Sequence, residues 1–457
     1  MAAVTVSIPS AAAAIAAYPP LSTDFNGDGY NDLVVGSPAA TVHKHPWAGH
    51  VTVLYGSSAG VSTTKRQNLD QDSAGVPGVT EAYDSFGNAT AVGDFNGDGF
   101  ADLAVASFQE STNAGTNAGS VTVFFGGGSG LGKPVTFLEP DGGASWRYFG
   151  QALGAADIDN DGRTELLIAS GSGATYIAAF GATPAAPSFT AFATLHEPHF
   201  VPYDVAGGDV TGDGYGDVVV RNAGGSISLY QGGPTGIGGR GPDITVDTEG
   251  SDGDVVIADI NGDGTGDVVV GRPGTAKGGA ITVFYGTPTG LTKGPSFGQN
   301  SAGVPGTDET GDFFGDALAV GDANGDGYGD VAIGAKYEDV NSIRNAGCVT
   351  LLKGGAQGLT VTGAQAWQQD STGIPGSSEP DDRFGAAVSL IDHNRDGKAD
   401  LTIGVDGENN DSGSVILLKG AASGITTSGA RWAGPATVGA PTGAGQFGGV
   451  LINNHAP

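Results

Sequence analysis

One nonapeptide recurs seven times along the chain, and this repeat limits the possible fold more than any other feature. Successive copies begin 50 to 70 residues apart within a chain of 457 residues. Seven related units leave no room for a second large domain, so the repeat itself defines the architecture. The pattern is D-x-[D/N/T]-x-D-G-x-x-[D/E], and its copies begin at Asp24, Asp94, Asp157, Asp209, Asp259, Asp322 and Asp392.

Each copy lies within the same succession of predicted strands. An apolar run precedes the nonapeptide, as in FGNATAVGD before Asp94, and a β-branched run follows it, as in DLAVAS from Asp102. A glycine turn then leads to an alternating run such as GSVTVFFG, and a weaker fourth segment follows. Period-two alternation and Gly/Pro/Asn/Asp punctuation indicate strands and turns. Four short strands per unit, repeated seven times, predict an all-β fold, a seven-bladed β-propeller of four-stranded blades.

The nonapeptide itself has the composition of a calcium loop. Side-chain oxygens at positions 1, 3 and 5 converge in a turn, the glycine at position 6 permits the bend, and the acid at position 9 completes the set. An all-oxygen, carboxylate-rich set suits Ca²⁺ rather than zinc or copper. Position 9 opens a strand rather than a helix, so these are strand–loop–strand sites and not EF-hands.

We therefore expect up to seven Ca²⁺ ions, one in each blade. The expected metal ligands are Asp24, Asn26, Asp28, Asp32, Asp94, Asn96, Asp98, Asp102, Asp157, Asp159, Asp161, Glu165, Asp209, Thr211, Asp213, Asp217, Asp259, Asn261, Asp263, Asp267, Asp322, Asn324, Asp326, Asp330, Asp392, Asn394, Asp396 and Asp400.

The seven loops are not expected to bind equally. A single copy would be compatible with an ordinary Asx turn, because Asp, Asn and Gly favour turns without metal. Seven copies that each open a strand favour metal binding. Thr211 is a neutral ligand at position 3 of its loop, and His393 and Arg395 lie inside the last loop, which should weaken that site.

The segment FGNATAVGDFNGDGFADLAVAS at Phe86–Ser107 resembles the FG-GAP repeat, which has a Phe-Gly pair, a strand, a calcium loop and a second strand. The resemblance extends over residues 21–450, although the two blades with loops from Asp209 and Asp259 lack the Phe-Gly pair. FG-GAP repeats build the propeller of integrin α subunits. This resemblance implies an extracellular adhesion or recognition module for a protein or carbohydrate ligand, with no Arg-Gly-Asp tripeptide to identify it. Phe-Gly pairs stand at Phe86, Phe149, Phe314, Phe384 and Phe447.

The two ends of the chain have separate expectations. Residues 1–20 are small and apolar without a basic start, and we interpret them as the remnant of an export signal or a disordered leader. A single propeller is expected over residues 21–457. Near the C-terminus, Phe447–Ile452 supplies a Phe-Gly pair and an apolar run with no acidic loop after it. This segment should add the inner strand that the first blade lacks and so close the ring; the alternative is a truncated eighth blade.

Composition excludes several classes of protein. The formal net charge is −30, with 19 basic against 49 acidic residues, so nucleic acid is not an expected partner. No apolar run reaches 18 residues, so no transmembrane segment is expected. The one cysteine, Cys348, forms no intramolecular disulfide and is expected to be a buried small hydrophobe. We expect a monomer that is secreted or lies at the cell surface.

Catalytic motifs are weak in this sequence. GSSAG at Gly56–Gly60 matches G-x-S-x-G, but no predicted helix follows it to form a nucleophile elbow. HEPH at His196–His199 lacks the zinc-site spacing H-E-x-x-H. We therefore predict a binding protein and not an enzyme. A hydrolase with a propeller scaffold and a purely structural surface protein remain as alternatives.

The expected binding surface lies on the loops between second and third strands, opposite the acidic loops. These connections are long in only some blades, beginning at Ser37, Ser107 and Lys336. Long loops on a rigid scaffold are where binding residues concentrate. The alternative is tolerated variation in loop length. The candidate ligand-binding residues are His43, His45, Trp47, Phe108 and Tyr337.

Overall fold

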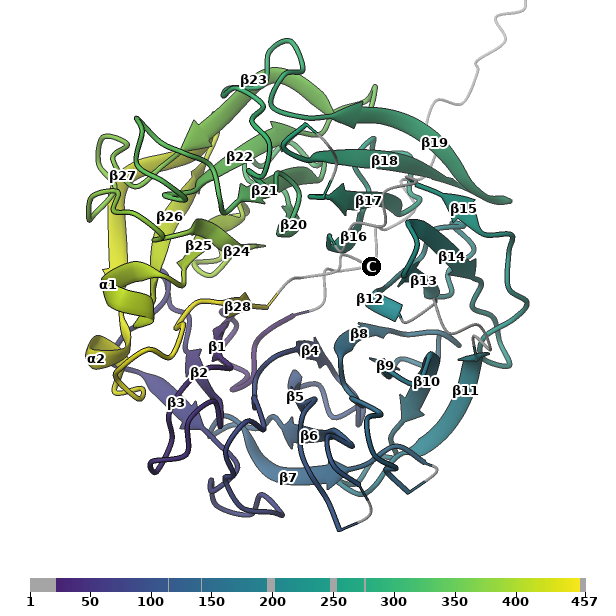
Figure 1. Cartoon of the computed structure of the whole chain (residues 1–457). Helices are drawn as coiled ribbons and strands as arrows, with labels where there is room; N and C mark the ends of the chain where they lie inside the picture. Colours follow the sequence, from purple (N-terminus) through teal and green to yellow (C-terminus); the bar gives the residue numbers. More distant parts are fainter. Residues whose placement is uncertain are drawn as a thin grey trace, which may run out of the picture.

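Seven antiparallel sheets surround a common axis, and they follow one another around the ring in chain order (Figure 1). The computed structural model describes residues 22–113, 115–140, 142–194, 202–246, 253–274 and 277–452. Each sheet has four strands, so the predicted all-β, seven-bladed propeller is confirmed. The predicted leader at residues 1–20 and the HEPH segment lie outside the described residues.

The four strands of each blade pair as neighbours, from the innermost to the outermost. The first three blades contain β28 (Val450–Leu451), β1 (Leu33–Ser37), β2 (His50–Leu54) and β3 (Arg66–Leu69); β4 (Thr90–Gly93), β5 (Asp102–Ser107), β6 (Ser120–Phe125) and β7 (Gly132–Phe137); and β8 (Ala152–Ala156), β9 (Glu165–Ala169), β10 (Ala174–Ala179) and β11 (Ser188–Thr194).

The remaining four blades have the same order of strands. They contain β12 (Pro202–Gly208), β13 (Asp217–Asn222), β14 (Ser226–Tyr230) and β15 (Ile244–Thr245); β16 (Val255–Ala258), β17 (Asp267–Arg272), β18 (Ala280–Thr287) and β19 (Gly290–Phe297); β20 (Leu318–Gly321), β21 (Asp330–Ala335), β22 (Cys348–Lys353) and β23 (Thr360–Trp367); and β24 (Phe384–Ile391), β25 (Asp400–Val405), β26 (Ser414–Ala421) and β27 (Gly424–Ala433). Two four-residue helices, α1 (Glu408–Asp411) and α2 (Pro435–Val438), lie in connections.

The hydrophobic cores lie between neighbouring blades. Strands β5 and β6 are buried along their whole length, whereas the outer strand β7 is mostly half-buried. A representative cluster joins Phe125 of β6 to Leu153 and Leu166 of the next blade. This two-sided burial explains why the second strands read as continuous β-branched runs in the sequence.

The five Phe-Gly pairs that begin a blade each join it to the preceding blade. Phe149 is fully buried, and its N–H donates to the Ala118 carbonyl of the preceding blade at 3.0 Å. Gly119 follows with φ +81°, and a Cβ there would lie 2.3 Å from the backbone N and O of Phe149. Gly150 in turn donates its N–H to Ala169 of its own blade at 3.1 Å. Close backbone approach, which glycine permits, therefore links the blades.

Half-buried aspartate side chains make a comparable link from the two blades that lack the Phe-Gly pair. Asp204 Oδ2 accepts the N–H of Val255 at 2.8 Å, which joins β12 to the neighbouring inner strand β16. Asp254 Oδ2 accepts the N–H of Leu318 at 3.0 Å and joins β16 to β20. These carboxylate links were not predicted from the sequence pattern.

The C-terminal strand closes the ring, as predicted. Strand β28 pairs antiparallel with β1, with Leu451 opposite Val35 and Val450 opposite Gly36. Within the described residues the chain forms seven sheets, and Phe447–Ile452 completes the first of them rather than starting an eighth. No helix of the described part of the chain is long and apolar enough to span a membrane.

The close approach at the Phe-Gly pairs can be tested with two alanine substitutions in the seventh blade. Gly413 and Gly429 have nearly equal φ values, +82° and +81°. A Cβ at Gly413 would lie 2.3 Å from the backbone N and O of Phe447, whereas a Cβ at Gly429 meets nothing within 4 Å. Gly429→Ala should cost about 1–2 kcal/mol through the left-handed backbone alone.

We expect Gly413→Ala to lower the melting temperature at least twice as far as Gly429→Ala, measured by circular dichroism in calcium. Equal losses would show that the approach of Phe447 to Gly413 does not matter for stability.

Candidate functional site

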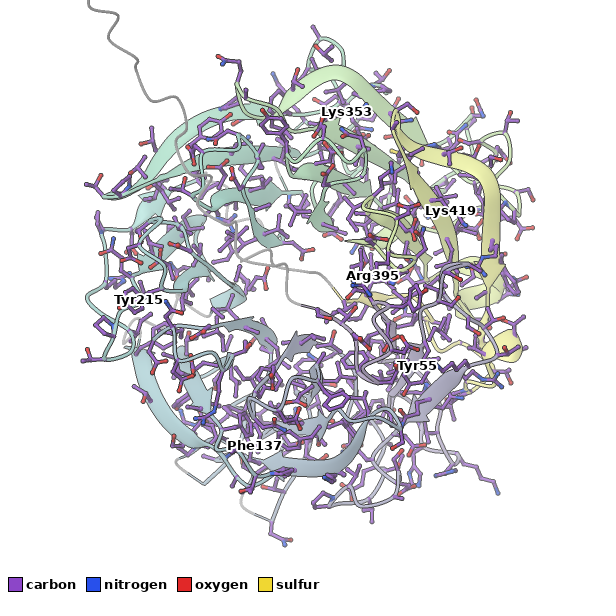
Figure 2. The ribbon with its side chains drawn as sticks, turned by 180° about the vertical axis from the view of Figure 1, so that it is seen from behind. Tyr55, Phe137, Tyr215, Lys353, Arg395 and Lys419 are labelled. Atoms are coloured by element: carbon purple, nitrogen blue, oxygen red, sulfur yellow. The ribbon has the colours of Figure 1, made fainter. Side chains whose placement is uncertain are left out.

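The seven acidic nonapeptides all lie on one face of the ring. Six of them connect the first strand of a blade to the second, as Asp94–Asp102 does between β4 and β5. The remaining nonapeptide leads into β1, whose inner partner is β28. Figure 2 shows the ring from behind and labels Tyr215 and Arg395, which belong to two of these loops. We call these segments the acidic loops.

The carboxylate at position 1 organises the turn of each acidic loop. In the second loop, Asp94 Oδ1 accepts the N–H groups of Gly97 at 2.8 Å and Asp98 at 3.0 Å, and Asp94 Oδ2 accepts that of Gly99 at 2.8 Å. The bond from the position-6 glycine recurs in all seven loops. Gly99 has φ +87°, a conformation that glycine adopts without strain. The loops are therefore shaped by their own backbone.

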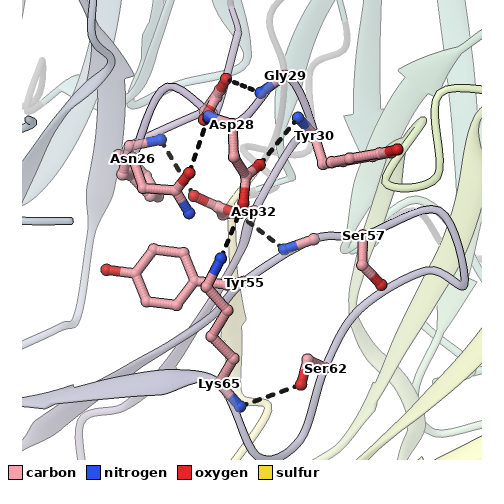
Figure 3. A network of polar contacts seen from close by, with 12 residues as sticks. Asn26, Asp28, Gly29, Tyr30, Asp32, Tyr55, Ser57, Ser62 and Lys65 are labelled. Carbon is pink, nitrogen blue, oxygen red and sulfur yellow. Dashed lines mark hydrogen bonds and ion pairs between the residues drawn. The ribbon is translucent and has the colours of Figure 1, made fainter. Parts of the chain in front are cut away.

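The carboxylate at position 9 is buried and ties the acidic loop to the rest of its blade. Asp102 Oδ2 accepts the N–H of Phe95 at 3.0 Å, and Asp102 Oδ1 accepts that of Gly126, beyond the third strand, at 2.8 Å. Figure 3 shows the first loop, where Asn26, Asp28 and Asp32 lie together. Asp32 is fully buried and makes the equivalent two bonds.

Burial makes the charged form of these position-9 acids unfavourable. The main cause is loss of solvent, and the carboxylates at positions 1 and 5 of the same loop add to it. Backbone N–H donors only partly offset this effect. The pKa is raised to about 7 for Asp32, Asp102, Asp267 and Asp330, to about 8 for Glu165, and to about 6 for Asp217 and Asp400.

Unpartnered oxygens at position 3 show that the loops fit a hard cation. Asn96 Oδ1, Asp159 Oδ1 and Asn324 Oδ1 are buried and have no hydrogen-bond partner among the described residues. A buried acceptor without a donor costs about 1–3 kcal/mol. In the third loop, Asp157, Asp159 and Glu165 each bring one oxygen within 4.8 Å of the others. Carboxylate and amide oxygens of this kind are the donors that Ca²⁺ prefers.

Basic and amide groups make the loops unequal. Lys65 Nζ lies 2.8 Å from Asp28 Oδ2 in the first loop, and Arg163 Nη1 lies 3.6 Å from Asp161 Oδ2 in the third. In the last loop, Asn394 Nδ2 donates to the Asp400 carboxylate at 3.2 Å and 3.3 Å. The Asn394 side chain therefore turns its N–H group, and not the oxygen that would bind a metal ion, toward Asp400.

His393 and Arg395 differ in their effect on the last loop. His393 is buried, which lowers its pKa to about 4 and leaves the ring neutral near pH 7. A Cβ at Gly29 would lie 2.8 Å from Arg395 Nη1, so this guanidinium reaches the neighbouring first loop. Arg395 therefore supplies positive charge beside the first loop, whereas His393 supplies none.

The candidate ligand-binding residues lie on the other face, but in different environments. Trp47 is 48% exposed, His45 is exposed, and His43 Nδ1 lies 2.7 Å from Asp72 Oδ2. Phe108 packs on Tyr148 and Tyr337 packs edge-on against Phe313, with ring centroids 6.0 Å and 5.1 Å apart. Phe108 and Tyr337 are therefore partly used in packing.

Two exposed aromatic residues on this face were missed in the sequence. Tyr83 and Trp146 are each 60% exposed, and each lies three residues before the Phe of a Phe-Gly pair. Their φ values are +75° and +64°, whereas Gly311 and Asp381 occupy the same position before two other pairs, with φ +101° and +67°. Aligning the residues that precede each Phe-Gly pair would have exposed this difference. Tyr83 lies beside the Trp47 loop, since its N–H donates to the Pro46 carbonyl at 3.0 Å.

Comparisons with known protein families match most of these blades. The family described as FG-GAP repeat matches residues 20–54, 86–124, 314–352 and 384–418. The family described as FG-GAP-like repeat matches residues 209–270. These segments include six of the seven acidic loops.

Individual relatives match over a limited part of their length. Phosphatidylinositol-glycan-specific phospholipase D of Rattus norvegicus is 36% identical over 152 residues, which are 33% of this chain and 18% of that protein. Integrin alpha-IIb of Homo sapiens is 33% identical over 176 residues, 35% of this chain and 15% of that protein. The matched part is thus less than a fifth of either relative. A crystal structure of BBS1N in complex with ARL6DN, soaked with lead, aligns with a TM-score of 0.46 at 12% identity, over 90% of this chain and 93% of that chain.

The raised pKa values at position 9 predict how stability depends on pH without metal. Folded Asp102 holds its proton up to about pH 7, whereas the ordinary value for an aspartate is 3.8. Between these values the folded state binds more protons than the unfolded state, so the free energy of unfolding falls as pH rises. The melting temperature in EGTA should therefore fall from pH 5 to pH 8.

Excess calcium should remove this fall, because a bound cation replaces the proton as the partner of the carboxylate. Differential scanning fluorimetry at four pH values, with EGTA or calcium, measures both curves. A melting temperature in EGTA that rises over this interval would contradict the electrostatics described for position 9.

Proposed function

Because the chain is an FG-GAP repeat β-propeller, we propose that it is a secreted, calcium-stabilised recognition module that binds a protein or a glycan. The ligand would bind the face opposite the acidic loops. The family matches and the similarity to integrin alpha-IIb support a recognition role. The observation that carries the proposal is the set of exposed aromatic residues on that face.

Calcium in this proposal is a structural ion. The residues at positions 1, 3, 5 and 9 of each acidic loop would hold it, and up to seven ions would bind. The ion would neutralise the buried position-9 carboxylate and provide a partner for the position-3 oxygens. Loops with several exposed carboxylates suit the millimolar calcium outside cells, which supports an extracellular location.

The aromatic residues are held outward at a cost in backbone energy. Trp47, Tyr83 and Trp146 all have positive φ, and bulky side chains rarely adopt this conformation. Such strain costs about 1–3 kcal/mol per residue and concentrates at functional sites. Gly311, at the same position before Phe314, meets this backbone requirement without that cost. We infer that Tyr83 and Trp146 are retained for contact with a ligand, since aromatic rings stack on sugars and anchor protein interfaces.

Binding is favoured over catalysis. The GSSAG segment lies between strands β2 and β3, and Ser57 Oγ donates to the Gly60 carbonyl at 2.7 Å, so this is a strand–turn–strand connection. A nucleophile elbow requires a helix after the serine. The relative named for a phospholipase D shares 18% of its length with this chain, and its activity is not carried over.

Chelation tests the structural role of calcium. An ion that binds only the folded state stabilises it by about 2.7 kcal/mol per site at a hundredfold excess over the dissociation constant. EGTA at constant pH should therefore lower the melting temperature by many degrees, and calcium should restore it. Magnesium should restore it poorly, since Mg²⁺ demands a small octahedral shell. An unchanged melting curve in EGTA contradicts the proposed role.

A matched pair of variants provides the control at single loops. Asp263 and Asp213 both occupy position 5, and each accepts a backbone N–H, from Thr265 and Tyr215 respectively. Asp263→Ala should remove one calcium and lower the melting temperature. Asp213→Ala should have a smaller effect, because Thr211 already weakens that loop.

The recognition face is tested with glycine substitutions that separate binding from stability. Tyr83→Gly and Trp146→Gly remove the exposed rings and relieve the positive φ, so the melting temperature should stay level or rise. Binding to the ligand found on glycan and extracellular-protein arrays should fall at least tenfold. Trp432→Ala is the control, because Trp432 is 37% exposed on the outer strand β27. Undiminished binding by the double glycine variant would place the ligand elsewhere.

A further inference from the structure

At three boundaries between blades, the connection that leaves one blade forms a cluster of carboxylates with a loop of the next blade. These clusters lie on the face opposite the acidic loops. In the first, Gln71, Glu81 and Asp84 lie between β3 and β4, and Glu110 lies between β5 and β6 of the next blade. Gln71 Nε2 donates to Glu110 Oε2 across the boundary between the two blades. The N–H of Glu81 donates to Asp84 Oδ2 at 2.8 Å. We call this site a seam pocket.

The second seam pocket repeats these contacts between the fifth and sixth blades. Gln299 Nε2 donates to Glu338 Oε2, and the N–H of Glu309 donates to Asp312 Oδ2 at 2.6 Å.

The third seam pocket lies between the sixth and seventh blades. Gln369 Nε2 donates to Glu408 Oε2, and the N–H of Glu379 donates to Asp382 Oδ2 at 2.6 Å. The same Gln–Glu contact, made by different residues, thus occurs at three boundaries between blades.

The carboxylates of the first seam pocket lie at metal-ligand spacing. Glu81, Asp84 and Glu110 each bring one oxygen within 4.8 Å of the others. Asp84 is 2% exposed, and the imidazole of His45 is the basic group that acts on it. Burial, with the neighbouring carboxylates, raises the pKa of Glu110 to about 7. Three acids this close lack an equivalent positive charge.

Each seam pocket also contains a glutamine whose side-chain oxygen has no hydrogen-bond partner among the described residues. Gln71, Gln299 and Gln369 are 6%, 2% and 1% exposed, and the Oε1 of each has no hydrogen-bond partner among the described residues. The Nε2 of the same amide donates to the Glu of the pocket, so each unpartnered Oε1 belongs to a side chain that already contacts that carboxylate. A buried acceptor without a hydrogen-bond partner costs about 1–3 kcal/mol of stability, and each of the three seam pockets contains one such glutamine oxygen.

A second orphaned oxygen recurs at one position of the same connections. Asp308 Oδ1 and Ser378 Oγ each immediately precede the Glu of their pocket, and each is buried without a partner in the described structure. Buried oxygens without a hydrogen-bond partner recur beside clustered acids. This recurrence indicates a cation that binds oxygen ligands.

The boundary between the second and third blades shows what happens when the protein supplies the partners itself. Glu139 follows β7, and its Oε1 accepts the hydroxyls of Ser170, Ser172 and Tyr176 at 2.9–3.0 Å. Arg147 Nε lies 3.6 Å from Glu139 Oε2. A buried acid at this boundary is thus matched by three hydroxyl donors and a guanidinium, whereas Glu110 of the first seam pocket accepts a single glutamine N–H.

We propose that the seam pockets are a second class of divalent-cation site, distinct from the acidic loops. In the first pocket the carboxylates of Glu81, Asp84 and Glu110 and the amide oxygen of Gln71 bind the ion. An all-oxygen donor set selects a hard cation, and Ca²⁺ tolerates its irregular arrangement. The ion joins the connection leaving one blade to a loop of the next, beside the exposed Trp47 and Tyr83.

Metal counting with isosteric variants tests this proposal. Radioactive ⁴⁵Ca in equilibrium dialysis counts the ions bound by the whole chain and gives their dissociation constants. Glu110→Gln keeps the shape of the side chain and removes its charge, so it should lower the count by one. The variant Glu110→Gln/Glu338→Gln/Glu408→Gln should lower it by three. Unchanged counts in both variants overturn the proposal and leave the pockets to water and shared protons.

Gln71→Leu separates a ligand role from a structural one. If Gln71 Oε1 binds the cation, this variant should weaken one calcium site at least tenfold. If the oxygen has no ligand, the variant should leave all calcium affinities unchanged, which contradicts the proposal. Asp263→Ala is the control for the acidic loops, and its effect on the count should add to that of Glu110→Gln.

A crystal structure of the unsubstituted protein in calcium decides the matter if the variants fail to fold. An anomalous-difference peak among Glu81, Asp84 and Glu110 supports the proposal. A water molecule or an empty pocket there overturns it, whatever the acidic loops contain.

Discussion

The buried carboxylate at position 9 is the interaction on which the rest of this propeller depends. It opens the second strand of each blade, and in the second blade Asp102 bonds both the acidic loop, through Phe95, and the turn beyond the third strand, through Gly126. This one side chain therefore fixes the loop, the second strand and the third strand relative to one another. Its burial makes the charge costly, and a hard cation held by the same loop is the simplest compensation. In each repeat the position-9 carboxylate thus holds the loop and strands together through hydrogen bonds, and its buried negative charge requires a compensating cation.

The geometry of the blades divides this chemistry between two faces. Strand direction places the acidic loops on one face and the longer connections on the other. Glycines with positive φ, such as Gly119, allow each Phe-Gly pair to approach the preceding blade, so the blades form a closed frame. Strained aromatic residues and clustered carboxylates are tolerated on the second face because this frame holds them in place. The exposed rings of Tyr83 and Trp146 on this face suit ligand recognition. The seam pockets lie on the same face, at boundaries between blades.

The sequence was sufficient for the features that repeat at fixed spacing. The nonapeptide, the β-branched second strand and the closure by Phe447–Ile452 all follow from local patterns, and the structure has the corresponding strands. Contacts between blades were not predictable in this way. Gln71 and Glu110 are 39 residues apart and meet only when two blades pack together. Likewise, the positive φ of Trp146 depends on the backbone of its connection, and Lys65 reaches Asp28 from the connection that precedes β3.

The most direct test of the account is an anomalous-difference map from crystals grown in calcium, recorded at long wavelength. We predict a peak in the acidic loops, bounded by the oxygens at positions 1, 3, 5 and 9, and strongest where no basic or amide group competes, as in the loop that begins at Asp259. Peaks there would establish that the cation compensates the buried carboxylate. Acidic loops without peaks in saturating calcium, with Asp102 and its equivalents bonded to backbone N–H groups alone, would contradict the account.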